Sequence, residues 1–95
     1  MPDSFSDLYK TIELRKKSKN KNSYTRKLYN SGEKIIAQKF GEESAELIID
    51  FLKGSKKRTT EEAIDVIYHL FVLLSAKKIK FNDLEKEILK RKNVR

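Results

Sequence analysis

Residues 61–76 read EEAIDVIYHLFVLLSA, and this stretch decides the fold. From position 63 to position 76 apolar side chains point in every direction around a helix, and four polar residues interrupt them. A helix of this kind is expected to be buried on all sides. Apart from Glu61 and Tyr68, its ionisable side chains share one narrow stripe, which contains Glu62, Asp65 and His69. The sequence therefore predicts a buried central helix with a single ionisable stripe.

A second long helix is predicted before it, from Glu33 to Lys53, with Gly54 as its end. Apolar residues cover more than half of its circumference. Four carboxylates occupy an arc of their own between isoleucines, with only Lys39 as a nearby cation: Glu42, Glu43, Glu46 and Asp50. A solvated face normally mixes both signs of charge, so this arc is a candidate functional site.

Three shorter amphipathic helices complete the expected fold. Their predicted ranges are 4–17, then 24–31 with Ser23 as N-cap and Gly32 as its end, and 83–92 with Asn82 as N-cap. The apolar central helix is expected to begin between 55 and 60 and to end near Lys77. We expect one all-α domain over residues 1–95, a bundle of four to five helices.

The composition excludes several classes of protein. The 95 residues include no cysteine and one histidine, which removes disulfide scaffolds, cysteine nucleophiles and most histidine-rich metal sites. Three glycines and one proline leave little to separate the strands of a sheet. No apolar run approaches the roughly 18–20 residues of a membrane span, and residues 1–4 lack the order of a signal peptide. We expect a soluble, cytoplasmic protein without a membrane partner.

The formal charge of +8 is unevenly distributed. Residues 42–52 and 61–76 together hold seven carboxylates and no Lys or Arg, whereas basic runs occur at 15–19 and 56–58. These runs either form a solvated surface or attract a polyphosphate ligand. Neither run contains the aromatic residues typical of nucleic-acid surfaces, so no nucleic-acid partner is expected.

The carboxylate pattern indicates a metal site. Carboxylates beside apolar surface repel one another and lose hydration unless a cation or a proton neutralises them. Glu43 with Glu46, and Glu62 with Asp65, have the i, i+3 spacing that lets two facing helices direct oxygen ligands at one hard cation. Two such pairs on two mostly apolar helices predict a Mg²⁺ site.

Structural roles remain open for individual members of this set. Glu62 follows Thr59 by three residues and could complete a capping box at a helix start. Asp50 could face water or pair with Lys53. His69 could be a hydrogen-bonded core histidine, or it could support the site through a bond to a carboxylate.

The segments Glu42-Glu43-Ser44-Ala45-Glu46 and Glu62-Ala63-Ile64-Asp65 resemble the acidic signature of the all-α nucleoside triphosphate pyrophosphatases, the MazG-like superfamily. Ser23-Tyr24-Thr25 and Tyr68-His69-Leu70 are similar to segments of the phosphoribosyl-ATP pyrophosphatases of histidine biosynthesis. The resemblance spans roughly residues 5–90.

The resemblance implies a MazG-like bundle that hydrolyses phosphoribosyl-ATP to phosphoribosyl-AMP and pyrophosphate, the second step of histidine biosynthesis. It implies Mg²⁺, or Mn²⁺ in its place, on Glu43, Glu46, Glu62 and Asp65. We expect Glu42 to orient or deprotonate the attacking water, with His69 in support. Expected phosphate contacts are Arg15, Lys27 and Lys39, and Ser23 and Thr25 offer hydroxyls or helix caps beside them.

A homodimer is also expected, because three short helices cannot cover two long apolar ones in a chain of 95 residues. The resemblance implies the same, and Leu70, Phe71 or Leu74 is predicted at the interface.

Two other functions fit the sequence. A related house-cleaning pyrophosphatase would use the same metal site on non-standard nucleotides, whereas a basic helical module would bind RNA without turnover.

Overall fold

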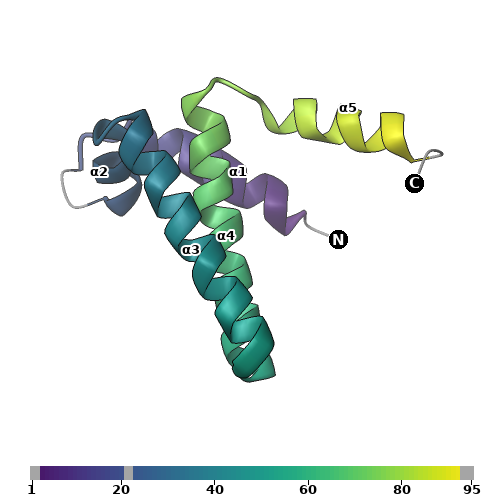
Figure 1. Cartoon of the computed structure of the whole chain (residues 1–95). Helices are drawn as coiled ribbons and strands as arrows, with labels where there is room; N and C mark the ends of the chain where they lie inside the picture. The colour runs from purple at the N-terminus through teal and green to yellow at the C-terminus, as the bar shows by residue number, and fades with distance from the viewer. Residues whose placement is uncertain (1–2, 21–22, 93–95) are drawn as a thin grey trace.

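The computed structural model describes residues 3–20 and 23–92, and every regular element in them is an α-helix (Figure 1). The helices are α1 (Ser4–Lys16), α2 (Tyr24–Asn30), α3 (Glu33–Lys53), α4 (Lys56–Ala76) and α5 (Phe81–Arg91). The predicted all-α fold is therefore confirmed, and the bounds of α3 agree with the sequence prediction.

Side-chain caps explain where most of these helices begin. Ser23 accepts a hydrogen bond from the backbone of Arg26 and caps α2 as predicted. Ser55 caps α4 in the same way. The prediction of Asn82 as a cap was wrong: the Asp83 side chain accepts from the Lys80 backbone at 2.8 Å, so α5 already begins at position 81.

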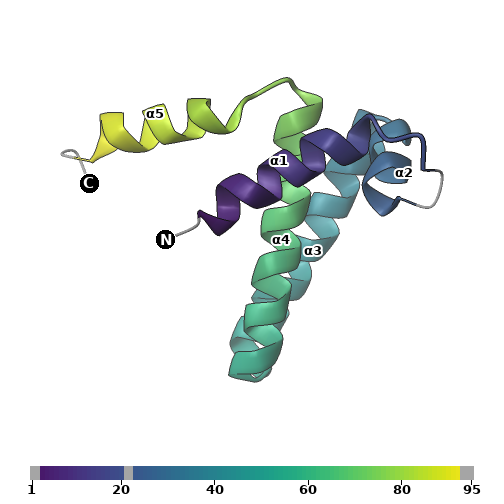
Figure 2. The same ribbon diagram turned by 180° about the vertical axis from the view of Figure 1, so that it is seen from behind.

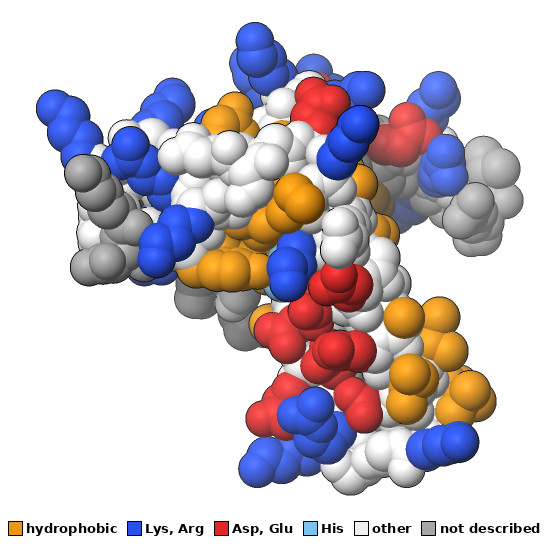
Figure 3. All heavy atoms as spheres, turned by 60° about the vertical axis from the view of Figure 1, so that its left-hand side comes forward, with side chains coloured by type: hydrophobic (Ala, Val, Ile, Leu, Met, Phe, Trp, Pro, Cys, Tyr) orange, Lys and Arg blue, Asp and Glu red, His pale blue; other side chains and the backbone are white. Residues whose placement is uncertain are grey.

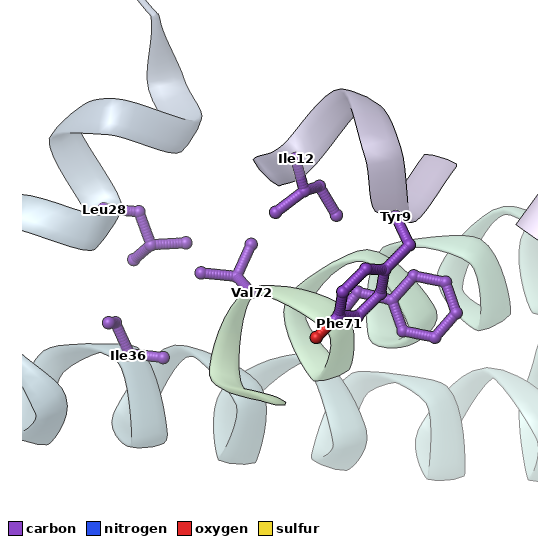
Figure 4. Close-up of a cluster of buried hydrophobic side chains, with 6 residues drawn as sticks. All are labelled: Tyr9, Ile12, Leu28, Ile36, Phe71 and Val72. Atoms are coloured by element: carbon purple, nitrogen blue, oxygen red, sulfur yellow. The ribbon is translucent and has the colours of Figure 1, made fainter. Parts of the chain in front are cut away.

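The core lies where α1 and α2 cover one end of the α3–α4 pair (Figure 4). Six buried apolar residues from four helices form it: Tyr9, Ile12, Leu28, Ile36, Phe71 and Val72. Leu28 of α2 is buried, whereas Tyr29 beside it is only half-buried. Since Ile36 is near the start of α3 and Val72 near the end of α4, the core occupies one half of this pair only.

The other half of the α3–α4 pair projects from the core as an antiparallel hairpin (Figures 1 and 2). Two residues, Gly54 and Ser55, connect the helices. A Cβ on Gly54 would lie 2.9 Å from the Asp50 carbonyl oxygen, so only glycine fits this tight connection. The hydroxyl of Thr59 also donates to that carbonyl, at 3.0 Å, and ties the two helices together.

The α4 helix is not buried on all sides within one chain, contrary to the sequence prediction. Its second half supplies Phe71 and Val72 to the core, whereas Ile64 in its first half is 51% exposed. Exposed apolar side chains on the projecting hairpin form what we call the distal apolar surface: Ile48, Ile49, Phe51, Leu52 and Ile64. The reason is that, within residues 3–20 and 23–92, no third helix reaches this half of the hairpin (Figure 2).

The α5 helix extends away from the hairpin (Figure 1). Its first turn packs on the core, where the Phe81 ring lies 5.8 Å from that of Tyr9, but Ile88 and Leu89 further along are both 67% exposed. No helix among the described residues has the length and apolar character needed to cross a membrane.

Candidate metal centre

The short connection between α3 and α4 aligns their acidic residues. Glu46 precedes Gly54 by eight residues and Glu62 follows it by eight. Glu43 and Asp65 stand eleven residues away on either side. Because both helices rise by about 1.5 Å per residue, antiparallel pairing brings each pair to the same height along the hairpin. The i, i+3 spacing then places the two members of each helix's pair on the same side of that helix.

Three of these side chains converge. Glu43, Glu62 and Asp65 each offer a carboxylate oxygen, and the three oxygens lie within 4.8 Å of one another. Figure 3 shows acidic side chains gathered on one face of the projecting hairpin, beside a separate hydrophobic area. We call Glu43, Glu46, Glu62 and Asp65 the acidic cluster. All four were predicted from the sequence to face one site.

Glu62 is the buried member of the acidic cluster, with 5% of its surface exposed. Its Oε2 atom is buried and has no hydrogen-bond partner among the described residues. Burial raises the pKa of Glu62 to about 7, and the neighbouring carboxylates of Glu43 and Glu46 add to the shift. Glu46 therefore also lies close enough to act on Glu62.

The capping alternative for Glu62 is excluded by the start of α4. Thr59 lies inside this helix, where its hydroxyl donates to the carbonyls of Asp50 and Ser55. Asp50 does not pair with Lys53, as was considered, but with Arg58, at 3.8 Å. Glu62 thus reaches the acidic cluster without a capping role.

Arg58 is the cation beside the acidic cluster, and the sequence analysis missed its role. Its guanidinium lies 3.7 Å from the carboxylate of Glu62, 3.5 Å from that of Glu61 and 3.8 Å from that of Asp50. The i, i+4 spacing from Arg58 to Glu62 was a signal that could have indicated this contact. The buried Oε2 atom of Glu62 has no hydrogen bond to Arg58.

The residues of the acidic cluster fit a hard divalent cation. Their donor atoms are all carboxylate oxygens, which Mg²⁺ and Mn²⁺ prefer. They come from two helices, the oxygens of Glu43, Glu62 and Asp65 converge, and Glu62 holds a buried oxygen that lacks a partner among the described residues. A cation would satisfy that oxygen and remove the repulsion that raises the pKa of Glu62.

Glu42, the expected base, lies outside this convergence. Its carboxylate is exposed, accepts a hydrogen bond from Gln38 at 2.9 Å and pairs with Lys39 at 3.5 Å. The bond from Gln38 and the charge of Lys39 lower the pKa of Glu42. The Glu42 side chain is therefore ionised at neutral pH. Glu42 is adjacent to Glu43 in the sequence.

His69 joins α4 to α2. Its Nδ1 lies 2.7 Å from the main-chain carbonyl of Asp65, so this nitrogen carries the proton, and its Nε2 lies 3.1 Å from the Tyr24 hydroxyl. His69 thus bonds to the Asp65 backbone and to Tyr24, and the bond to a carboxylate that the sequence left open is not made among the described residues. Tyr24, which was not singled out from the sequence, is half exposed beside the ring of Tyr68.

The expected phosphate contacts lie on three helices around this arrangement. Arg15 is exposed at the end of α1, and its charge acts on the Tyr68 hydroxyl, whose pKa burial raises. Lys27 is exposed on α2, and Lys39 is half-buried one turn before Glu43. The two hydroxyls serve the fold: Ser23 caps α2, and Thr25 is buried and hydrogen bonded to Tyr68.

Comparisons with known proteins agree with this geometry. Residues 5–92 match the family described as Phosphoribosyl-ATP pyrophosphohydrolase. A Phosphoribosyl-ATP pyrophosphatase of Bacillus cereus (strain B4264) is 45% identical over 91 residues, which are 96% of this chain and 85% of that protein. A Histidine biosynthesis bifunctional protein HisIE of Staphylococcus aureus (strain Mu50) is 38% identical over 95 residues, all of this chain and 45% of that protein.

Proposed function

The chain belongs to the phosphoribosyl-ATP pyrophosphohydrolase family, and we propose that it hydrolyses phosphoribosyl-ATP to phosphoribosyl-AMP and pyrophosphate with a divalent cation on the acidic cluster. The names of its relatives place this reaction in histidine biosynthesis. The observation that carries the metal is the convergence of Glu43, Glu62 and Asp65, with a buried Glu62 oxygen that lacks a partner.

The reaction requires a water molecule to attack a phosphorus atom of the triphosphate and pyrophosphate to leave. A bound Mg²⁺ supplies charge neutralisation on the phosphates and a lower pKa for a coordinated water. Glu43, Glu46, Glu62 and Asp65 would hold the cation, and the hydrogen bond from Thr59 to Asp50 ties together the two helices that carry them. Glu42 orients the attacking water or accepts its proton, next to a metal ligand but outside the ligand set.

Basic side chains at the edges of the acidic cluster would bind the phosphates. Lys39 has half-exposed side-chain atoms and already pairs with an exposed carboxylate that a phosphate could replace. Arg15 and Lys27 present cations from α1 and α2, on the side where α2 meets α4. Ser23 and Thr25 contribute by shaping this end of α2.

The active unit would be a homodimer. The distal apolar surface contains five large apolar side chains on two neighbouring helices, with Phe51 73% and Leu52 69% exposed. A second copy that packs its own hairpin against this surface would form a four-helix bundle. Of the three residues expected at the interface, Phe71 is buried inside the chain, and Leu70 and Leu74 are partly buried against the core. We therefore propose that the interface lies on the outer half of the hairpin.

The experiment that tests the activity is an assay of pyrophosphate release from phosphoribosyl-ATP, run beside a panel of standard and non-standard nucleoside triphosphates. We expect Mg²⁺-dependent turnover of phosphoribosyl-ATP and little turnover of the panel. Preference for a panel nucleotide would favour the house-cleaning alternative. We expect the reaction to take place in the cytoplasm, where nucleotide substrates of biosynthesis are made.

A further inference from the structure

Arg58 is positioned as a substitute cation for the acidic cluster. It lies in the first turn of α4, and its guanidinium lies within 3.5 to 3.8 Å of the carboxylates of Asp50, Glu61 and Glu62. Two hollows of the surface have Arg58 in their lining. One also contains Glu46 and Asp50, and the other contains Asp65.

The contacts of Arg58 are loose. Its side chain is 58% exposed, and all three separations exceed those of a close ion pair. Exposed pairs of this kind contribute little free energy and exchange readily. The buried Oε2 of Glu62 also remains without a partner beside Arg58, so the arginine compensates the charge of the acidic cluster only in part.

We propose that Arg58 is a built-in counter-cation that partly neutralises the empty acidic cluster and that a divalent cation must displace. The inference rests on the proposed function, because it takes the acidic cluster to be a metal site. A positive guanidinium near Glu62 repels an incoming divalent cation. The guanidinium also pairs with Glu62, which is one of the proposed metal ligands. Arg58 therefore lowers the affinity for the metal while it stabilises the metal-free protein.

Substitution of Arg58 by glutamine tests this role with little risk to the fold. The backbone N–H of Arg58 is bonded to the Ser55 hydroxyl, and glutamine keeps both this cap and the helix propensity. The matched control is Lys57→Gln, which removes the same charge from the adjacent position. Lys57 is exposed and has no ion pair with any described residue.

The measurement is the dissociation constant of Mn²⁺, the probe metal, from the full chain without substrate. We expect Arg58→Gln to bind Mn²⁺ roughly threefold to tenfold more tightly than the native protein, and Lys57→Gln to stay within about twofold of it. Arg58→Lys should lie between, because it keeps the charge but loses the forked guanidinium. The thermal midpoint of metal-free Arg58→Gln should fall below that of Lys57→Gln, and saturating Mn²⁺ should remove this difference.

Two outcomes would overturn the proposal. If Arg58→Gln binds Mn²⁺ with equal or lower affinity than Lys57→Gln, Arg58 is not a competitor of the metal. If neither the native protein nor any variant binds Mn²⁺, both this proposal and the metal-dependent function fail. Native binding without tightening in Arg58→Gln would leave the proposed function intact.

Discussion

Glu43 and Glu62 lie on different helices, yet each brings a carboxylate oxygen within 4.8 Å of the other. Burial raises the pKa of Glu62, and the repulsion between two ionised carboxylates at this separation adds to the shift. A site that is unfavourable when empty gains stability from a bound cation. This relation between the two glutamates is the basis of the predictions that follow.

The substitution Glu46→Gln should lower turnover of phosphoribosyl-ATP by orders of magnitude. It removes a charge from the acidic cluster while it keeps the shape of the side chain. The metal-free variant should be folded and at least as stable as the native protein, because Glu46 is one of the carboxylates that raise the pKa of Glu62. Near-normal turnover at saturating Mg²⁺ would remove Glu46 from the ligand set.

The stability of the metal-free protein should depend on Glu62 between pH 4.5 and about 7. In this window Glu62 keeps its proton in the folded protein. In the unfolded chain the pKa of glutamate is 4.5, so Glu62 releases this proton. The folded state binds more protons, so the contribution of Glu62 to stability falls as pH rises through the window.

The test of this pH dependence compares the free energies of unfolding of the native protein and Glu62→Gln in the presence of chelator. As pH rises from 4.5 to about 7, the free energy of unfolding of Glu62→Gln should increase relative to that of the native protein. Above this range the difference between the two free energies should be constant. A difference that does not change across this range would show that Glu62 titrates normally in the folded protein.

Replacement of Lys27 or Lys39 by methionine should raise the Michaelis constant for phosphoribosyl-ATP more than it changes the thermal midpoint. Methionine keeps much of the length of lysine and removes the charge that would bind a phosphate. Lys34, an exposed residue at the start of α3, provides the control position for Lys→Met. If both variants keep the native Michaelis constant, these lysines belong to the solvated surface.

The substitution Phe51→Glu should convert the proposed homodimer into a species that is monomeric or aggregated. Phe51 is 73% exposed in the single chain, so within that chain the charge costs little, whereas at a packed interface it would be buried without a partner. Light scattering measures the mass. A native protein of 11.2 kDa that is stable and active at micromolar concentration would refute the dimer.

The helices and the convergence of Glu43, Glu62 and Asp65 could be predicted because they depend on local spacing. Gly54 and the apolar periodicity fix α3, and a hairpin with a short turn pairs Glu46 with Glu62 by distance along the chain. The start of α5 was predicted wrongly because Asp83, inside the helix, bonds back to Lys80. This competing capping interaction leaves no room for Asn82 as the cap.

Contacts between distant helices could not be predicted from the sequence. The partner of His69 is Tyr24, 45 residues earlier, and it depends on how α2 packs on α4. The uneven burial of α4 has the same origin, since α1 and α2 cover one of its halves only (Figure 2). Periodicity describes each helix alone and does not tell which neighbour covers which half.

The most direct test of the metal centre compares two neighbouring glutamates. Glu61 is exposed, whereas Glu62 is buried in the acidic cluster, and glutamine at either position makes the same chemical change. The measurement is pyrophosphate release from phosphoribosyl-ATP at increasing Mg²⁺ concentrations. We predict that Glu62→Gln loses at least about a hundredfold in turnover and that Glu61→Gln stays within about threefold of the native rate. Equal rates in the two variants would contradict a metal centre on α3 and α4.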